Sequence, residues 1–130
     1  DTVNAIGDGK EPRYSSGKKV PRWTSRPQQG KPQWVDARFA GTKPIRSVGV
    51  YWMQDRVDVK FPAEWLLEVK QGGKWKPFEL YTTDRYETRA NQYNVVHPAA
   101  PLRCDAIRIK MVPKEDACVG ILEVQVVFEK

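Results

Sequence analysis

The segment 81–93 is the part of the chain that is richest in side chains able to hold a polar ligand. It contains three tyrosines, two arginines, an aspartate and an asparagine, with little apolar residue to anchor it in a core. Aromatic rings stack against the C–H faces of a sugar, and guanidinium groups and carboxylates hydrogen-bond to pairs of hydroxyl groups. We therefore interpret this segment as a candidate carbohydrate site. Tyr86 or Tyr93 is the candidate stacking platform, and the candidate donors are Arg85 and Arg89.

A shorter segment, 54–58, adds groups of the same chemical kind. Asp55 is a candidate acceptor for sugar hydroxyl groups, and Arg56 is a further candidate donor. The competing interpretation is that both segments are solvated loops, whose internal ion pairs contribute little energy each. The residue types alone leave both interpretations open.

The same segments hold carboxylate pairs that could in principle cleave a glycosidic bond, a reaction that needs two carboxyl groups across a cleft. The available pairs are Asp55 with Asp58 and Asp84 with Glu87. Basic neighbours keep these carboxylates ionised, whereas a general acid needs a raised pKa. A single histidine and two cysteines also disfavour a histidine-based triad or a zinc site. We predict that the chain is not an enzyme.

The chain of 130 residues carries 22 lysines and arginines against 16 aspartates and glutamates, a net charge of +6. Residues 1–43 hold nine basic and four acidic side chains, so most of the excess lies in the N-terminal third. Such an excess indicates a solvated basic face, a surface for an acidic polysaccharide or a nucleic-acid footprint. Because no zinc-finger, cold-shock or RNP-type motif is present, nucleic acid ranks last among the three.

The candidate residues lie between segments in which apolar and polar residues alternate, the pattern typical of β-strands. We expect strands over 34–39, 45–52, 65–70, 75–80, 93–97, 106–112 and 121–128. Gly72 and Gly73 predict a tight hairpin between two of these strands, because glycine accepts a positive φ. One apolar face per strand predicts an all-β fold, a sandwich of about eight antiparallel strands.

Five tryptophans lie on or beside these expected strands. Trp34, Trp52 and Trp65 are expected to pack in the core. For Trp23 and Trp75, the pattern does not decide between a place in the core and a place on the surface.

Cys104 and Cys118 lie at the ends of two late strands. A disulfide between them would suit an exported protein. Two separate buried thiols are the favoured alternative, since nothing in the sequence places the pair within the roughly 7 Å Cα separation that bridging requires.

Seven segments, in order along the chain, resemble motifs of the coagulation factor five/eight type C (discoidin) domains. They are NAIGDG at 4–9, RWTS at 22–25, QWVDARF at 33–39, IRSVGVYW at 45–52, GGKWKP at 72–77, AIRI at 106–109 and GILEV at 120–124. The resemblance runs collinearly from residue 4 to residue 128. It implies a jelly-roll-like sandwich of eight strands that spans residues 1–130 as a single domain.

A narrower resemblance concerns the C-terminal discoidin-like domain of proteins similar to glycoside hydrolase family 127, the bacterial β-L-arabinofuranosidases and their relatives. The segments that carry it are DGKEP at 8–12, SS at 15–16, VYW at 50–52, PAEW at 62–65 and GILE at 120–123. It implies a monomeric domain excised from a larger enzyme, with the glycoside hydrolase in cis and polysaccharide as partner. It also implies a secreted, periplasmic or cell-surface location. No apolar run approaches the roughly 20 residues of a membrane-spanning helix, so no membrane partner is expected.

The family resemblance also implies one structural calcium ion (Ca2+), held by an aspartate of the opening motif and a glutamate of the closing strand. These positions are Asp8 and Glu123 in this chain. A hard cation prefers several oxygen ligands and would tie two distant parts of the chain together. In the alternative interpretation, Asp8 caps a turn and Glu123 is a solvated strand residue.

The discoidin-like superfamily includes carbohydrate-binding module family 32, whose sugar site lies on loops at one end of the sandwich. The family's binding histidine corresponds to Thr24 or Ser25, its arginine corresponds loosely to Arg56, and the last loop, 113–117, lacks the family's aromatic residue. A galactose-type site is therefore not expected, and a sugar site would be built differently. The two polar segments described above are expected to approach each other.

These observations support three hypotheses about function. The first is a non-catalytic carbohydrate-binding module that targets an appended glycoside hydrolase to polysaccharide. The second is a structural accessory domain that packs against a catalytic domain without binding sugar, and it predicts an exposed apolar strip and no preformed pocket. The third is a protein- or nucleic-acid-binding domain that uses the basic N-terminal loops.

Overall fold

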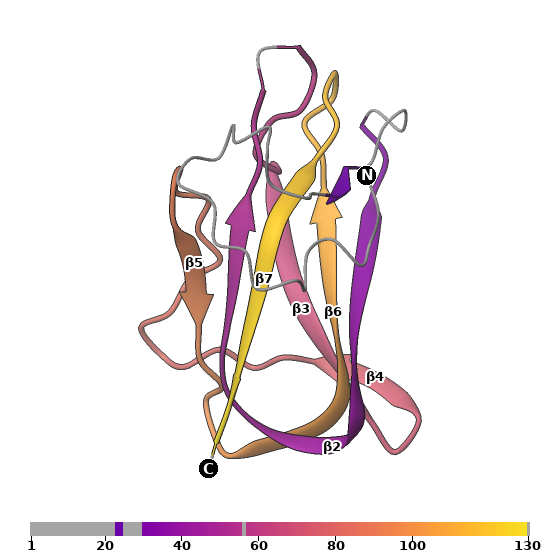
Figure 1. Ribbon diagram of the computed structural model, residues 1–130, viewed down its shortest axis with the longest axis vertical. Helices are drawn as coiled ribbons and strands as arrows, with labels where there is room; N and C mark the ends of the chain where they lie inside the picture. Colours follow the sequence, from indigo (N-terminus) through magenta and orange to yellow (C-terminus); the bar gives the residue numbers. More distant parts are fainter. Residues whose placement is uncertain (1–22, 25–29, 56, 130) are drawn as a thin grey trace.

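The computed structural model describes residues 23–24, 30–55 and 57–129 of the chain. This part contains seven β-strands, joined by turns and loops, and no helix (Figure 1). The strands are β1 (Trp23–Thr24), β2 (Gln33–Trp52), β3 (Glu64–Gln71), β4 (Lys74–Pro77), β5 (Tyr93–Val96), β6 (Leu102–Val112) and β7 (Gly120–Phe128). In this part of the chain, no helix is long and apolar enough to cross a membrane.

The longest strand, β2, takes part in both layers of the fold. Its first part pairs with β6, and its last part pairs with β7 on one side and β5 on the other. In Figure 1, β2 runs down one side of the molecule, crosses the bottom and rises on the other side. The bend lies near Gly41, whose φ of 87° favours glycine, and Pro44 follows where the register with β6 has shifted. The two strands expected at 34–39 and 45–52 are therefore one bent strand.

This bend turns one curled sheet into two layers. The strand order is β1-β7-β2-β6-β3-β4, with β5 added to β2. The last part of β2 forms one layer with β1, β5 and β7, and its first part forms the other layer with β3, β4 and β6. The pairings are antiparallel. The prediction of an all-β sandwich of antiparallel strands is confirmed.

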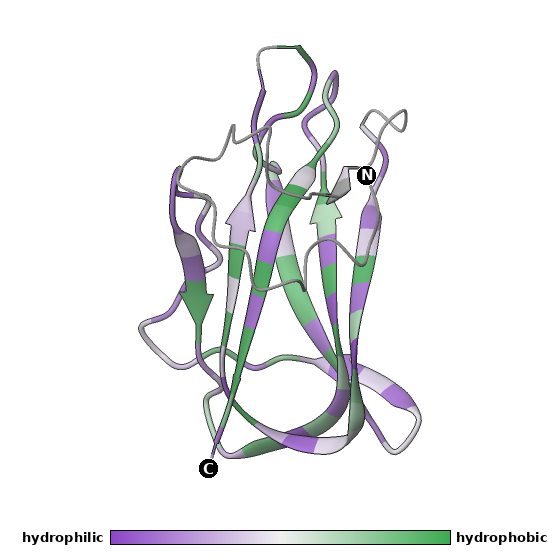
Figure 2. Cartoon of the chain, in the orientation of Figure 1, coloured by the Kyte–Doolittle hydropathy of each residue, from purple (hydrophilic) through white to green (hydrophobic). Residues whose placement is uncertain are grey.

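The core lies between the two layers and follows the alternation of the sequence, which Figure 2 shows as changes of colour along the strands. On β6, Ile107 and Ile109 are buried and Arg108 faces outward, as predicted. The facing layer contributes Val48 and Val50, which are also fully buried. The alternation fails at the start of β7, where residues 120–123 are all buried because a second apolar cluster covers the outer face of that strand.

The tryptophans divide between the core and the surface. Trp52 and Trp65 are buried and meet edge to face with ring centroids 5.2 Å apart, which confirms their predicted place. The prediction for Trp34 is wrong, since its side chain is 59% exposed. Its neighbour Val35 faces the core, and successive side chains of a strand point to opposite faces, so Trp34 must face outward. Trp75 is half-buried on the same outer face.

Two smaller predictions are also confirmed. Gly72 and Gly73 have φ values of 56° and 77° at the turn between β3 and β4, the conformation that a tight hairpin needs. Cys104 and Cys118 are two separate, fully buried thiols with no disulfide bond between them. Burial raises the pKa of the Cys104 thiol to about 11.

Candidate functional site

The polar segment singled out in the sequence forms a closed loop between β4 and β5. At its base, Leu80 bridges to Pro98, and the Tyr81 amide donates to the carbonyl of His97 at 2.9 Å. The loop thus leaves and returns at one place, next to the layer that contains β5 (Figure 1). Loops closed at the base in this way present their tips to solvent from a fixed position.

Tyr86 ties the first half of the loop to the core. Its hydroxyl accepts a hydrogen bond from the Leu67 amide at 3.1 Å and donates to the Phe78 carbonyl at 3.4 Å. Its ring meets the Trp65 ring edge to face, 4.8 Å between centroids, and burial raises the pKa of its hydroxyl. This geometry is that of an anchor, because ring and hydroxyl are already engaged. It does not support Tyr86 as an open stacking platform.

Trp65 and Asn94 hold the backbone of the second half. The indole Nε1 of Trp65 donates to the Glu87 carbonyl at 3.0 Å. The Asn94 side chain, only 5% exposed, accepts from the Arg89 amide at 2.7 Å and donates to the Arg89 carbonyl at 3.1 Å. It also reaches the Val50 carbonyl at 3.3 Å, which links the loop to β2.

Sequence reasoning missed Asn94 as a determinant of the site. The available signal is its position in the expected strand 93–97, where an amide shares a face with Val96. Both side chains are buried. A polar residue on the core face of a strand must find hydrogen-bond partners, and here those partners are the loop backbone.

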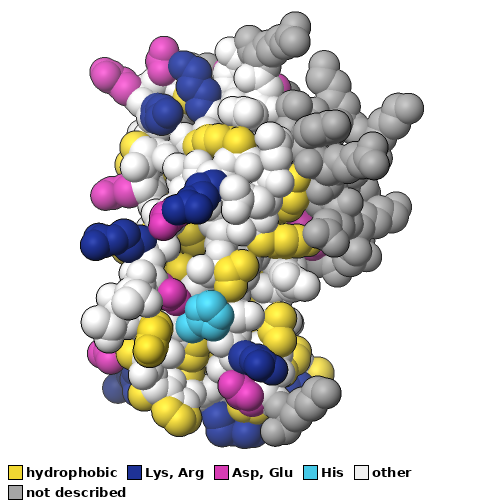
Figure 3. Space-filling model, turned by 90° about the vertical axis from the view of Figure 1, so that its left-hand side faces the viewer, with side chains coloured by type: hydrophobic (Ala, Val, Ile, Leu, Met, Phe, Trp, Pro, Cys, Tyr) yellow, Lys and Arg dark blue, Asp and Glu magenta, His cyan; other side chains and the backbone are white. Residues whose placement is uncertain are grey.

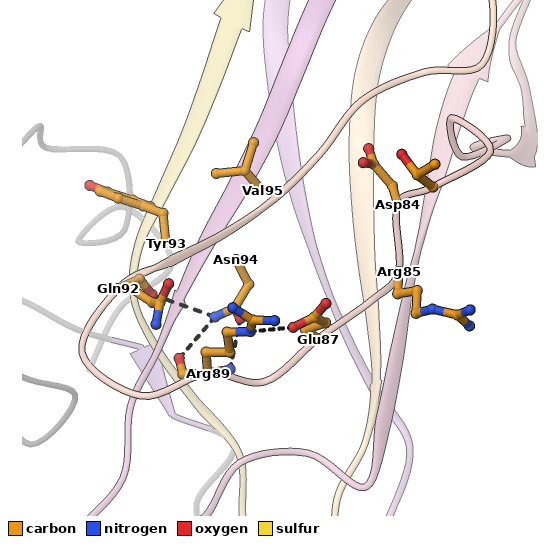
Figure 4. A pocket seen from close by; sticks show the side chains of 9 residues that line it. Asp84, Arg85, Glu87, Arg89, Gln92, Tyr93, Asn94 and Val95 are labelled. Atoms are coloured by element: carbon orange, nitrogen blue, oxygen red, sulfur yellow. Dashed lines mark hydrogen bonds and ion pairs between the residues drawn. The ribbon is translucent and has the colours of Figure 1, made fainter.

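The fixed backbone surrounds a polar hollow of about 210 Å³, which we call the β5 hollow (Figure 4). Its lining comprises Thr83, Asp84, Arg85, Glu87, Arg89, Gln92, Tyr93, Asn94 and Val95. Figure 3 shows the side of the molecule that carries β5, where basic and acidic side chains are interspersed. The hollow therefore offers hydrogen-bond donors and acceptors close together.

Neighbouring side chains and backbone groups hold two of the carboxylates in the β5 hollow. Arg89 pairs through Nε with the carboxylate of Glu87. Asp84 is mostly buried, and its Oδ2 accepts from the His97 amide at 2.6 Å and lies 3.0 Å from the His97 Nδ1. The Arg85 side chain points away from Arg89, toward the other rim (Figure 4).

The hollow unites three of the predicted sugar-binding residues, Arg85, Arg89 and Tyr93. The Tyr93 ring packs edge to face against Tyr51, 5.3 Å between centroids, and points away from Glu87 (Figure 4). The hollow thus contains two of the predicted donors, Arg85 and Arg89, without an aromatic platform at its centre.

The described residues of the segment 54–58 are not among the residues that line the β5 hollow, and the expectation that the two polar loops approach each other stays a prediction. The Oδ1 atom of Asp55 accepts hydrogen bonds from the amides of Val57, Asp58 and Val59, at 2.9, 3.0 and 2.9 Å. This oxygen closes a turn, so the structure gives Asp55 a local structural role. Arg56 lies outside the described residues.

The expected calcium ligands are described only in part. Glu123 is 2% exposed, and its Oε1 accepts from the Val124 amide at 3.1 Å, so the interpretation as a solvated strand residue is wrong. A buried carboxylate suits a cation ligand. Asp8 lies outside the described residues, and within those residues no group of three or more histidine, cysteine or acidic side chains could hold a metal. The calcium ion stays a prediction.

Neither a protein-family model nor a curated protein sequence matches the chain. Solved structures do match it over nearly its whole length. A structure of the Streptococcus pneumoniae β-galactosidase BgaA has a TM-score of 0.82 and 19% identity, covering 100% of this chain and 86% of that one.

Two further matches are carbohydrate-binding modules. The family 32 module of NanJ from C. perfringens, solved with galactose, gives a TM-score of 0.75 at 14% identity, with 99% and 85% of the chains covered. Chitosan-binding module 1 of a chitosanase/glucanase from Paenibacillus sp. IK-5 gives a TM-score of 0.67 at 15% identity, and the match covers 97% of this chain and 84% of that one. The chain therefore has the discoidin-like fold of family 32 carbohydrate-binding modules.

Proposed function

We propose that the chain is a non-catalytic carbohydrate-binding module and that the β5 hollow is its sugar site. The observation that carries the proposal is the ordering of the hollow, whose backbone is fixed by Tyr86, Trp65 and Asn94. Fixed donors and acceptors lose little conformational entropy when a ligand binds. The similarity to galactose- and chitosan-binding modules supports a sugar as the ligand.

The charges of the hollow favour a neutral, hydroxyl-rich ligand. Asp84 and Glu87 offset Arg85 and Arg89, so the lining has no net charge to attract an anion. The described contact of Arg89 engages Nε, which leaves its terminal nitrogens to donate to a pair of hydroxyl groups. A neighbouring carboxylate accepts from the same hydroxyls.

The surroundings of the two carboxylates support the absence of catalysis. Asp84 accepts from His97, and Glu87 pairs with Arg89. Both carboxylates are thus already engaged by neighbouring side chains, whereas a glycosidase needs two carboxyl groups that face the glycosidic bond across a cleft.

The alternative of a structural accessory domain predicts no ordered ligand pocket, so the hollow favours the binding module. A glycoside hydrolase in cis and an exported location belong to the proposal as well. They rest on the resemblance to the family 127-like enzymes.

A glycan microarray together with affinity gel electrophoresis tests the proposal. The panel contains arabinan, pectin, galactan, chitosan and sulfated marine glycans. We expect binding to a neutral glycan, and we expect Arg89→Ala to weaken it about tenfold, the loss of one charge-assisted hydrogen bond. Arg46→Ala is the matched control, because Arg46 is an exposed arginine on β2 outside the hollow. Absence of binding across the panel contradicts the proposal.

The proposed calcium ion has its own test. Metal analysis of the untreated protein should find bound calcium, and a chelator should lower the melting temperature. Glu123→Gln should abolish the chelator effect, while Glu129→Gln, an exposed control, should preserve it. A protein without bound metal contradicts this part of the proposal alone.

A further inference from the structure

The outer face of the layer formed by β4, β3, β6 and the first part of β2 carries two tryptophans around one arginine. The Cζ atom of Arg108 lies 4.0 Å from the ring centroid of Trp75 and 5.6 Å from that of Trp34. The two rings are therefore within about 10 Å of each other, although they come from β4 and β2. We call this surface the tryptophan face.

Carboxylates fix the arginine between the rings. Asp36 accepts from Nε and Nη2 of Arg108 at 2.7 and 3.0 Å, a bidentate pair in which both side chains are mostly buried. This hydrogen bond to Asp36 raises the pKa of Arg108. In the register of the sheet, Arg108 stands between Asp36 and Glu68, and Glu68 in turn lies 3.9 Å from the ammonium group of Lys110.

The face continues into a groove of about 470 Å³ beside Trp34. Leu66, 43% exposed, lines the groove together with Trp34, and Lys110 stands between them in the register. Gln33 and Glu64 add polar groups at the ends of the strands. An open aromatic ring is thus bordered by hydrogen-bonding side chains.

The composition of this face discriminates between kinds of partner. The cores of protein–protein interfaces are depleted in charge, but here a row of charged side chains, Asp36, Arg108 and Glu68, crosses the centre of the face. Nucleic acids need unpaired basic groups for their phosphates, but Arg108 and Lys110 are paired with carboxylates. Paired donors and acceptors beside aromatic rings suit the alternating hydroxyl groups and C–H faces of a sugar chain.

We infer that the tryptophan face is a second glycan-binding surface, which binds an extended polysaccharide chain. An open sheet face has no end wall, so a long chain can lie across it, whereas the β5 hollow suits a short unit. The tryptophan face shares no residue with the β5 hollow, so it would be a site additional to the one in the proposed function.

Nuclear magnetic resonance of nitrogen-15-labelled protein tests the inference directly, since the five tryptophans give five indole signals. The probes are soluble galactan, arabinan, pectin and chitosan. Trp34→Phe and Trp75→Phe assign two of the signals. We expect at least one polysaccharide to shift the Trp34 and Trp75 signals, and we expect Arg89→Ala to leave these shifts unchanged.

Affinity gel electrophoresis supplies the second readout. Trp34→Ala should weaken retention by that polysaccharide about fivefold, and Trp34→Phe should keep most of it, because the aromatic ring is what stacks. Trp34 is too exposed for its loss to unfold the protein. Val57→Ala, an exposed apolar side chain on a distant loop, should change nothing.

The outcomes separate the two sites. If Arg89→Ala abolishes binding and the Trp34 signal never moves, the tryptophan face is not a glycan surface and the proposed function stands. If Trp34→Ala abolishes binding and Arg89→Ala does not, the face is confirmed and the hollow is wrong as the site. If no polysaccharide shifts the Trp34 or Trp75 signal and none is retained in the affinity gel, both the β5 hollow and the tryptophan face are wrong as glycan sites.

Discussion

The β5 hollow and the tryptophan face reach a similar set of chemical groups by different structural routes. The hollow is made by a loop, and three side chains, Tyr86, Trp65 and Asn94, fix its backbone through hydrogen bonds. The tryptophan face is made by strand register, which places Asp36, Arg108 and Glu68 in one row without any loop.

The two surfaces are therefore sensitive to different kinds of substitution. A site on a loop depends on a few long-range hydrogen bonds, so a single substitution can disorder it while the sandwich persists. A site on a sheet face depends on the whole ladder of backbone hydrogen bonds, so the backbone that positions its side chains is lost only with the fold.

The largest expected effect is that of Asn94→Ala, which should damage the hollow alone. The substitution removes the side-chain partner of the partly buried Arg89 amide and of the buried Val50 carbonyl. Unsatisfied buried groups cost about 1–3 kcal/mol, so we expect a loss of about 2–3 kcal/mol in urea denaturation. Binding at the hollow should disappear.

The control for this prediction is Gln92→Ala, which changes an exposed residue of the same hollow. It should alter stability by less than about 0.5 kcal/mol. An Asn94→Ala protein that keeps wild-type stability would mean that the loop is held by other contacts, and the contrast between the surfaces would be lost.

Alkaline pH should produce the next largest decrease in the free energy of unfolding. This decrease should affect both surfaces together, because it acts on the whole fold. Cys104 lies in the core strand β6, and burial raises the pKa of its thiol from 9.0 to about 11. The unfolded chain releases this proton first. The contribution of the protonated Cys104 thiol to the stability of the fold is therefore fully present below about pH 9 and is lost as the pH rises toward 11.

The total loss should be on the order of 2 kcal/mol, from a shift of about two pKa units. Urea denaturation at several pH values measures it, and Cys104→Ala should flatten the dependence. Cys118→Ala serves as the comparison at the other buried cysteine. An unchanged alkaline dependence in Cys104→Ala would show that another group causes it.

A smaller effect, confined to the tryptophan face, should follow Asp36→Asn. The substitution removes the negative charge that holds Arg108 through two hydrogen bonds. We expect the free energy of unfolding to fall by about 1 kcal/mol, because charge-assisted hydrogen bonds are stronger than ordinary ones. The indole signal of Trp75 should shift as Arg108 loosens. Binding at the hollow should be unchanged.

Asp116→Asn is the matched control for this prediction. Asp116 pairs with Lys60 at 3.6 Å, but its side chain is exposed, so the pair should contribute almost nothing to stability. If the two substitutions have equal effects, the burial of Arg108 adds no rigidity to the face.

Local patterns in the sequence predict the strands, and they also predict part of each surface. The alternation in 106–112 gives the buried isoleucines and the outward Arg108 of β6. The same rule, applied strictly, places Trp34 opposite Val35 and therefore on the surface. The prediction that Trp34 is buried rests on its place in an expected strand, but that place puts its side chain on the face opposite Val35.

The parts that the sequence does not predict depend on contacts between distant segments. Arg85, Arg89 and Tyr93 fall together because one loop carries them. The anchoring of that loop joins residue 86 to residue 67 and residue 87 to residue 65, and no local pattern specifies such pairs. Likewise, Trp34 and Trp75 meet one arginine only because the registers of three strand pairs combine.

The smallest expected effect belongs to Tyr86→Phe, and it separates the two roles considered for this residue. The ring stays, so a stacking platform would keep its function and the protein would keep its stability. An anchor would lose its hydrogen bonds to Leu67 and Phe78, and we expect a loss of about 0.5–1 kcal/mol in urea denaturation. Tyr81→Phe, at an exposed tyrosine of the same loop, should have no effect. Equal stability of the two variants would remove Tyr86 as an anchor, and the hollow would then resemble the tryptophan face in depending on the sheet rather than on its loop.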